Sequence, residues 1–552
     1  VRGRDVAVTA GAGAGKTRAL VARYLALLAE GLPLRSVVAI TFTKKAAREM
    51  RNRARREIRR YLESAALAPA EQAHWQNLYS ELDAARISTI HTLCTEILRS
   101  HPAEANLDPR FGVLDEGPAA LLRSRAVEET MGWAANDPLA ATLFRALSEK
   151  DLRKNLTSLL EKRLDAASAF AAPGDDPSGC WSTALDAELT PVDADLARLF
   201  PVLQSAFDRA DGRYAELKRE QDALDFDDLE AGALALLNAR KDVLERWQAE
   251  VDALLVDEFQ DTNARQRELI RLLNGGRGRL FIVGDAKQSI YRFRGADVAV
   301  FRAERNQIGT DGGACLDMVT SFRAHKELVH ALNGLLEPVL GLRADPDRPW
   351  IEPFAPIVHH RHLPGAGFNA PFIELHVAIG SKTDGALLHA AKALAGKLRA
   401  MVESGTTLVF EEGQQRPLIY SHIAVLCRAS GSFRYYEDAF EAVGVPYLTV
   451  AGGGFYDRPE IRDLLNALRA LADPTDDLAL AGLLRSPACA LSDSALYGLN
   501  EFRRDIASST TLWQVLQGHG ASLPGDDGQA LSLIHISEPT RRTPISYAVF
   551  CL

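Results

Sequence analysis

The sequence has few cysteines, and they lie far apart. No two of them form a CxxC pair; the six positions are Cys94, Cys180, Cys315, Cys427, Cys489 and Cys551. This spacing argues against a zinc ribbon, an iron–sulfur cluster and a disulfide framework. Free thiols of this kind fit a reducing cytoplasm, which is the expected location.

Long hydrophobic runs are also missing. The chain has no uninterrupted apolar run of about 18 residues, the length that a membrane-spanning helix needs. Its first residues, Val1 to Asp5, lack the apolar segment of a signal peptide. We therefore expect neither a membrane association nor export.

An excess of positive charge is absent as well, since the formal net charge is −9. Phosphate binding requires Lys and Arg. An acidic chain can still line one groove with positive charge, so any nucleic-acid track must be local.

What is present fits a large globular protein. Hydrophobic residues make up 47% and charged residues 25% of the 552 residues, which is ordinary usage. Single cores stop growing at roughly 250–300 residues. We therefore expect two large domains with insertions.

Short apolar or β-branched runs, each followed by a helical stretch, predict repeated βα units and a parallel sheet. The predicted strands are Asp5–Thr9, Val37–Phe42, Arg86–Thr89, Ala253–Val256 and Leu280–Val283. Residues 105–220 are rich in Ala and Leu and predict a helical insertion, with a loop at 173–179. A second α/β region is expected from about Cys315, with strands at Leu316–Thr320, Phe372–Val377 and Ile423–Cys427.

A glycine-rich loop follows the first predicted strand and opens a helix, which is the context that a Walker A loop requires. Its small residues let backbone N–H groups surround phosphates at a helix N-terminus. Lys16 would hold the β- and γ-phosphates, and Thr17 would ligate Mg²⁺. The loop consists of Ala10, Gly11, Ala12, Gly13, Ala14, Gly15, Lys16 and Thr17.

Two adjacent acids follow the apolar strand Ala253–Val256, at the edge where ligands bind in open α/β sheets. Asp257 would hold Mg²⁺ directly or through water, and Glu258 would polarise the attacking water. The alternative, an acidic N-cap for the helix Asn263–Leu273, applies better to Asp261 than to this pair.

Six ordered blocks over about 310 residues resemble the UvrD, Rep and RecB/AddA helicases of superfamily 1. They are Ala10–Thr17, Ala39–Met50 (motif Ia), Ser88–Thr92 (motif Ib), Asp257–Thr262, Gly284–Asp297 (motif III) and Thr320–Arg323 (motif IV). Within this branch, Lys287–Arg294 and Leu224–Leu229 look more like the exonuclease V beta chain and AddA. The resemblance implies an α/β fold with two RecA-like parallel-sheet domains of the P-loop NTPase type.

The resemblance also implies roles for further residues around ATP. Gln288 would sense the γ-phosphate, and Arg323 would contact it with a planar guanidinium. Arg18 and Phe322 would enclose the adenine.

A DNA strand would run beside this site. The resemblance places Thr41, Phe42, His91, Tyr291, Phe293 and Arg294 along it, with Tyr291 and Phe293 stacking on bases. The two rings could instead be core aromatics, and His91 could be structural. The stretch Lys44 to Arg60 carries nine basic and two acidic residues; DNA attraction and a solvated helix face stay equally open.

The resemblance predicts a domain map in which the second domain is incomplete. Motifs V and VI and a nuclease domain are absent, and the upstream glutamine motif is missing, which should weaken adenine selectivity and turnover. Leu531 to Leu552 looks like translated sequencing adapter. The predicted segments are 1–104 and 221–312 (first RecA-like domain), 105–220 (helical insertion), 313–475 (second RecA-like domain), 476–530 (start of a second insertion) and 531–552 (non-native tail).

We therefore expect an ATP- and Mg²⁺-dependent 3′→5′ DNA helicase or translocase of repair and recombination. Its partners would be single-stranded DNA and duplex junctions, and its parent would be one component of a helicase–nuclease that has a second subunit. Two alternatives remain: another P-loop ATPase, or a fragment that binds ATP and DNA without productive turnover.

Overall fold

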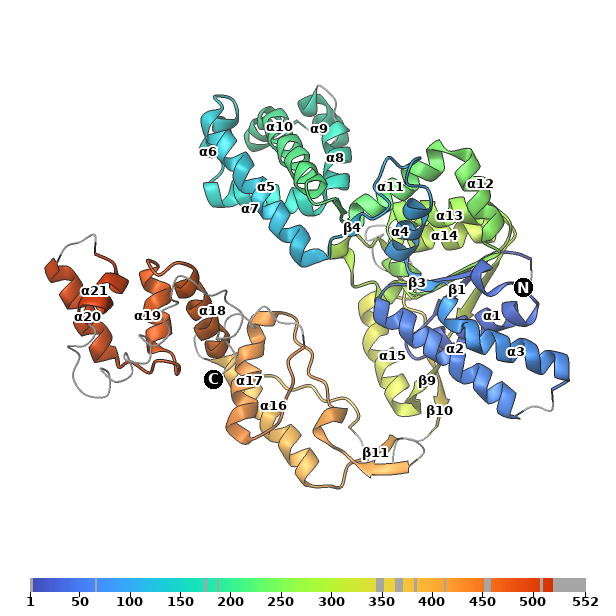
Figure 1. The fold of residues 1–552 in the computed structure, drawn as a ribbon. Coiled ribbons are helices and arrows are strands. Elements are labelled where there is room, and N and C mark those ends of the chain that lie inside the picture. Colours follow the sequence, from blue (N-terminus) through green and yellow to red (C-terminus); the bar gives the residue numbers. More distant parts are fainter. Residues whose placement is uncertain are drawn as a thin grey trace. The chain divides into compact units, whose positions relative to one another are not determined.

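The computed structural model describes residues 3–64, 67–172, 176–185, 188–343, 352–362, 371–381, 385–411, 414–450, 458–506 and 510–519. The chain divides into two units, Val1–Pro364 and Gly365–Leu552. Figure 1 shows the helices and strands of both. The predicted tail at 531–552 and most of Ala451–Asp463, which resembles the late part of a second domain, lie outside the described residues.

A six-stranded sheet forms the centre of the first unit, and every strand pair in it is parallel. The strand order is β3-β2-β6-β7-β1-β8. The strands are β1 (Val6–Ala10), β2 (Val37–Thr41), β3 (Ile87–Thr89), β6 (Ala253–Val256), β7 (Leu280–Gly284) and β8 (Ala314–Met318). The five strands predicted before residue 300 all lie in this sheet, so the predicted parallel arrangement is confirmed.

Helices cover both faces of the sheet, which explains why its strands are apolar throughout rather than alternating. In β2, Val38 and Ile40 enter one core, while Val37 and Ala39 enter the other. The first core packs under α4 (Ile90–Ser100), α11 (Phe226–Ala239), α12 (Lys241–Glu250), α13 (Ala264–Asn274) and α14 (Val298–Thr310). The second packs under α1 (Lys16–Ala29), α2 (Lys44–Ser64) and α3 (Pro69–Glu81).

The predicted helical insertion has its own hydrophobic core, in which Phe207 and Leu152 are buried. Its elements are α5 (Glu116–Asn136), α6 (Leu143–Ala146), α7 (Glu149–Glu161), α8 (Arg163–Ala171), α9 (Pro177–Leu185) and α10 (Pro191–Arg219). Strands β4 (Gly112–Val113) and β5 (Ala223–Leu224) pair where the chain leaves and returns. The loop predicted at 173–179 is too long, because Pro177 begins α9; residues 173–175 lie outside the described part.

The strand predictions after residue 312 are largely wrong. The run predicted at Leu316–Thr320 is split between two strands. Strand β8 is an edge strand of the first sheet, because β1 accepts it as a neighbour. Strand β9 (Thr320–His325) pairs with β10 (Val358–Arg361), and α15 (Lys326–Leu340) lies between them in sequence.

Phe372–Val377 and Ile423–Cys427 form no strand, although both lie within the described residues. Leu375 is 89% and Leu426 94% exposed. Without a neighbouring strand to bond their backbones and cover their side chains, β-branched sequence alone does not make a strand.

The second unit is mainly helical. Helices α16 (Ala386–Glu403) and α17 (Phe433–Val443) share a small core, and β11 (Leu408–Glu411) forms a hairpin with β12 (Gln414–Pro417). A separate core joins α18 (Pro459–Ala472), α19 (Asp477–Arg485), α20 (Asp493–Ile506) and α21 (Leu512–His519). Among the described residues, no helix combines the length and the apolar character that crossing a membrane requires.

Candidate active site

The glycine-rich loop joins the carboxyl end of β1 to α1, as predicted. Gly13 and Gly15 adopt φ of 75° and 89°, a region that residues with a Cβ rarely occupy. A Cβ on Gly13 would also lie 2.8 Å from Cβ of Arg323. Within the described residues, no hydrogen bond uses the N–H groups of Gly13, Gly15, Lys16 or Thr17. These free donors at a helix N-terminus suit a phosphate group.

Lys16 joins the loop to two other strands of the sheet. Its Nζ lies 2.8 Å from Oε2 of Glu258, which follows β6, and 3.1 Å from Oε1 of Gln288, which follows β7. The ammonium is largely buried. Three residues that the sequence placed in one ATP site therefore meet at one point, although more than 240 residues separate Lys16 from the other two.

Three carboxylates gather at the end of β6, and two of them have a raised pKa. Burial and the neighbouring Glu258 raise the pKa of Asp257 to about 6, although Lys16 and Arg53 act in the opposite direction. Burial and Glu258 raise the pKa of Asp261 to about 6 as well. The site is thus short of positive charge. Residues Thr17 and Asp257 fit the Mg²⁺ predicted there, because a divalent cation would offset this repulsion.

Asp261 does not cap the following helix, contrary to the alternative considered for it. It ends the short 3₁₀ helix η4 (Phe259–Asp261). The side chain of Asn263 caps α13 instead, and Gln266 completes a capping box. An amide at this position satisfies the first N–H groups without adding another negative charge.

Gln260 connects the carboxylates to motif III, a role that the sequence did not reveal. Its side chain is 1% exposed. The Nε2 atom donates to Glu258 at 2.9 Å and to Asp261 at 3.3 Å, while Oε1 accepts the N–H of Asp285 at 2.9 Å. Asp285 in turn accepts from Nε2 of Gln288 at 2.8 Å. A hydrogen-bonded path therefore runs from Glu258 to Gln288 inside the sheet edge.

Replacing Gln260 by methionine, which has a similar volume, should lower the free energy of unfolding by about 1–3 kcal/mol. The buried N–H of Asp285 would lose its acceptor, and two carboxylates would lose a donor. Denaturant unfolding measures the change.

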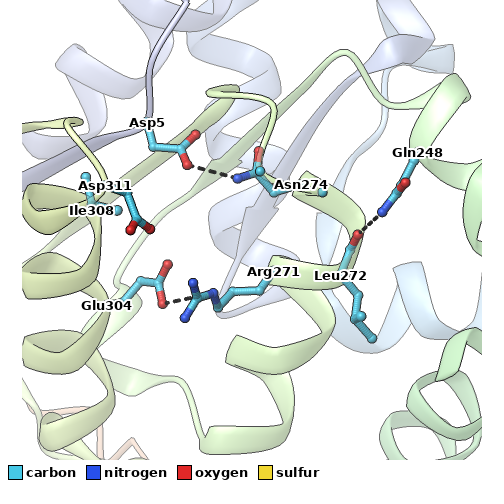
Figure 2. A pocket seen from close by; sticks show the side chains of 10 residues that line it. Asp5, Gln248, Arg271, Leu272, Asn274, Glu304, Ile308 and Asp311 are labelled. Carbon is cyan, nitrogen blue, oxygen red and sulfur yellow. Dashed lines mark hydrogen bonds and ion pairs between the residues drawn. The ribbon is translucent and has the colours of Figure 1, made fainter.

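The matched control is Gln248→Met, which removes one bond to the carbonyl of Leu272 at 2.7 Å. Gln248 borders a polar pocket of about 210 Å³ at the opposite, amino-terminal edge of the sheet (Figure 2). Its loss should cost less. Equal destabilisation by the two variants would contradict the linking role of Gln260.

Motif IV lies against the phosphate loop. The N–H of Phe322 donates to the carbonyl of Gly13 at 3.0 Å, which brings Arg323 beside the loop. The ring of Phe322 is 49% exposed and packs on His360, with 4.6 Å between ring centroids. Arg18 is exposed on α1. The enclosure of adenine by Arg18 and Phe322, and the phosphate contact of Arg323, stay predictions.

Aromatic rings form a patch next to the nucleotide residues. Tyr291 follows Gln288 by three positions and packs on Phe42, with 4.6 Å between centroids. Phe293 lies 5.9 Å from Tyr291 and is 69% exposed. These rings are therefore surface groups rather than the core aromatics of the alternative interpretation. Thr41 is buried and donates to the carbonyl of Thr43 at 3.1 Å; the Arg294 side chain lies outside the described part.

His91 has a partner inside the protein. Its Nε2 lies 3.0 Å from Oε1 of Glu230, and its ring packs on Phe226 at 4.5 Å. Burial would raise the pKa of Glu230, but hydrogen bonds from His91, Gln266 and Asn263 hold it below its usual value. These contacts favour the structural interpretation of His91, while its DNA contact stays a prediction.

Two family models match the sequence. The UvrD/REP helicase N-terminal domain matches residues 2–309, and the UvrD-like helicase C-terminal domain matches residues 316–512.

Curated relatives show the same likeness at low identity. The "DNA helicase II" of Salmonella typhimurium is 26% identical over 93% of this chain and 58% of that protein. The "ATP-dependent DNA helicase UvrD1" of Mycobacterium leprae is 28% identical over 89% and 54%. An ATP-dependent helicase/nuclease subunit of Listeria innocua is 25% identical over 90% of this chain and 52% of that protein. The chain thus spans about half the length of these relatives.

Proposed function

Since the chain belongs to the UvrD/Rep helicase family, we propose that it is an ATP-driven motor that moves 3′→5′ along single-stranded DNA. The bonds of Lys16 to Glu258 and Gln288, three residues before the ring of Tyr291, support this proposal most directly. A parent that belongs to a two-subunit helicase–nuclease of DNA repair and recombination fits the names of the relatives.

In the proposed reaction, the free N–H groups of the loop and Lys16 hold the triphosphate. Thr17 and Asp257 would hold Mg²⁺, which would neutralise charge on the phosphates. Glu258 orients and polarises the attacking water. Arg323 reaches the γ-phosphate from β9, which lies against the loop. Arg18 and Phe322 enclose the adenine.

Lys16 couples nucleotide binding to the DNA side. Without nucleotide, Lys16 holds both Glu258 and Gln288. When Lys16 turns to the β- and γ-phosphates, Glu258 becomes free to bind water and Gln288 becomes free to bind the γ-phosphate. A shift of Gln288 moves the segment that carries Tyr291 and Phe293. Because Tyr291 packs on Phe42 after β2, the shift changes the gap between rings that bases would enter.

Two measurements test the proposal. Single-stranded DNA should stimulate ATP hydrolysis by the chain, and duplexes with a 3′ single-stranded tail should be unwound in preference to those with a 5′ tail. Hydrolysis that DNA does not change would instead favour another kind of P-loop ATPase. Binding of ATP and DNA without turnover would overturn the motor proposal for this chain.

The aromatic patch makes a further prediction. Tyr291→Ala should weaken binding of single-stranded DNA by about 5- to 150-fold, because one stacked base is worth about 1–3 kcal/mol. Fluorescence anisotropy with a labelled oligothymidylate measures the affinity. Tyr61→Ala is the matched control, since Tyr61 is also partly exposed and packs on another ring, Trp75. Similar losses in both variants would contradict base stacking at Tyr291.

A further inference from the structure

Helix α2 carries most of the basic residues near the sheet edge, and the structure separates them into two groups. Five are held by neighbours. Both acids of the stretch 44–60 are used, since Glu49 pairs with Arg53 and Glu57 with Arg60. The other three bonds join Arg51 to the carbonyl of Ile87, Arg55 to Asp83 and Arg59 to the hydroxyl of Tyr79.

The remaining four cations have no such partner in the described part of the chain. Lys44, Lys45, Arg48 and Arg56 are all exposed. Positions 45, 48, 52 and 56 follow helical spacing and therefore lie along one line. The opposite face of α2 is buried in the sheet core by Ala47, Met50, Ala54 and Ile58. The basic residues thus form a solvent-facing stripe, an arrangement that the sequence alone did not resolve.

The stripe begins at the aromatic patch. Phe42 directly follows β2, and α2 starts two residues later at Lys44. From Lys44 to Arg56 the helix extends roughly 18 Å along the side of the unit. A surface hollow of about 400 Å³ continues the stripe and is lined by Glu49, Asn52, Arg55, Arg56 and Arg59.

We propose that this stripe, Lys44, Lys45, Arg48 and Arg56, binds the phosphate backbone of DNA that extends beyond the bases stacked near Phe42. The inference rests on the proposed function, because it extends the same DNA path. Charge complementarity supports it, since a chain with a net charge of −9 keeps four unpaired cations in one line. Contacts made only to phosphates are independent of base sequence.

The test compares two double variants of equal charge change. Arg48→Gln with Arg56→Gln removes two cations of the stripe. Arg4→Gln with Arg35→Gln removes two exposed cations that precede β1 and β2, at the opposite edge of the sheet. Glutamine retains helix propensity close to that of arginine. Circular dichroism and thermal melting should therefore match those of the unmodified chain.

The readout is the dependence of single-strand affinity on salt. For the stripe variant, the slope of log affinity against log salt should shrink by about 1.4, the value for two lost phosphate contacts on a single strand. The control variant should keep the original slope. The difference should appear with an oligothymidylate of about 20 nucleotides and disappear with one of about 5, which reaches only the rings.

Other outcomes overturn the inference in distinguishable ways. An unchanged slope in the stripe variant, or equal changes in both double variants, refutes the stripe while the proposed motor stands. Loss of affinity that is the same for short and long strands refutes the extended path. If the unmodified chain bound single strands without salt dependence, both the stripe and the proposed DNA function would fail.

Discussion

Replacing Lys16 by alanine is expected to weaken ATP binding by about 100-fold or more. Each charge-assisted bond from an ammonium to a phosphate contributes about 1.5–3 kcal/mol, and Lys16 would make two. Part of this gain is offset, because Lys16 must leave Glu258 and Gln288, to which it is bonded without nucleotide. Titration with a fluorescent ATP analogue in the presence of Mg²⁺ measures the affinity.

Lys287→Ala is the matched control for this change. Lys287 lies at the same edge of the sheet, with Nζ 3.5 Å from Asp285, but it does not belong to the phosphate loop. Its removal should change ATP affinity much less. Single-strand affinity should stay near that of the unmodified chain in the Lys16 variant, because the rings and the basic stripe do not depend on Lys16. ATP binding of normal strength by Lys16→Ala would refute the proposed nucleotide site.

The sequence predicts the central sheet well because the signal there is local. A parallel strand covered on both faces must be apolar at every position, and runs such as Ala253–Val256 show this directly. The partner of a strand is not a local property. Nothing in the residues around Cys315 shows that β8 extends the first sheet, and nothing in Ile423–Cys427 shows that no neighbour pairs with it.

The same division holds for the site. Motifs identify Lys16, Glu258 and Gln288 because each has a characteristic neighbour sequence, and the structure brings them within hydrogen-bonding distance. Gln260 and Arg53 were missed as contributors. Gln260 acts through bonds to Asp285, which lies on another strand, and Arg53 acts on Asp257 through space from α2. Such couplings depend on distances that a single sequence does not contain.

Glu258→Gln is expected to lower the rate of ATP hydrolysis by about 1,000-fold while ATP binding persists. A positioned general base contributes about 10²–10⁴-fold, and an amide cannot accept the proton of the attacking water. The amide oxygen can still accept a hydrogen bond from Lys16, so the loop keeps its arrangement. Steady-state phosphate release measures hydrolysis, and analogue titration measures binding. Hydrolysis within a few-fold of the unmodified chain would rule out Glu258 as the base.

The same variant should change how ATP·Mg²⁺ affinity depends on pH. Glu258 is one of two causes that raise the pKa of Asp257 to about 6. In the unmodified chain Asp257 becomes protonated as pH falls through about 6, and a protonated carboxyl no longer ligates the metal. Removing the negative charge of Glu258 should lower that pKa, so the variant should retain affinity at lower pH. The ratio of variant to unmodified affinity should therefore rise between about pH 7.5 and about pH 5. The titration of the nucleotide itself affects both proteins alike and cancels in the ratio. A constant ratio would show that Asp257 does not bind the metal or is not coupled to Glu258.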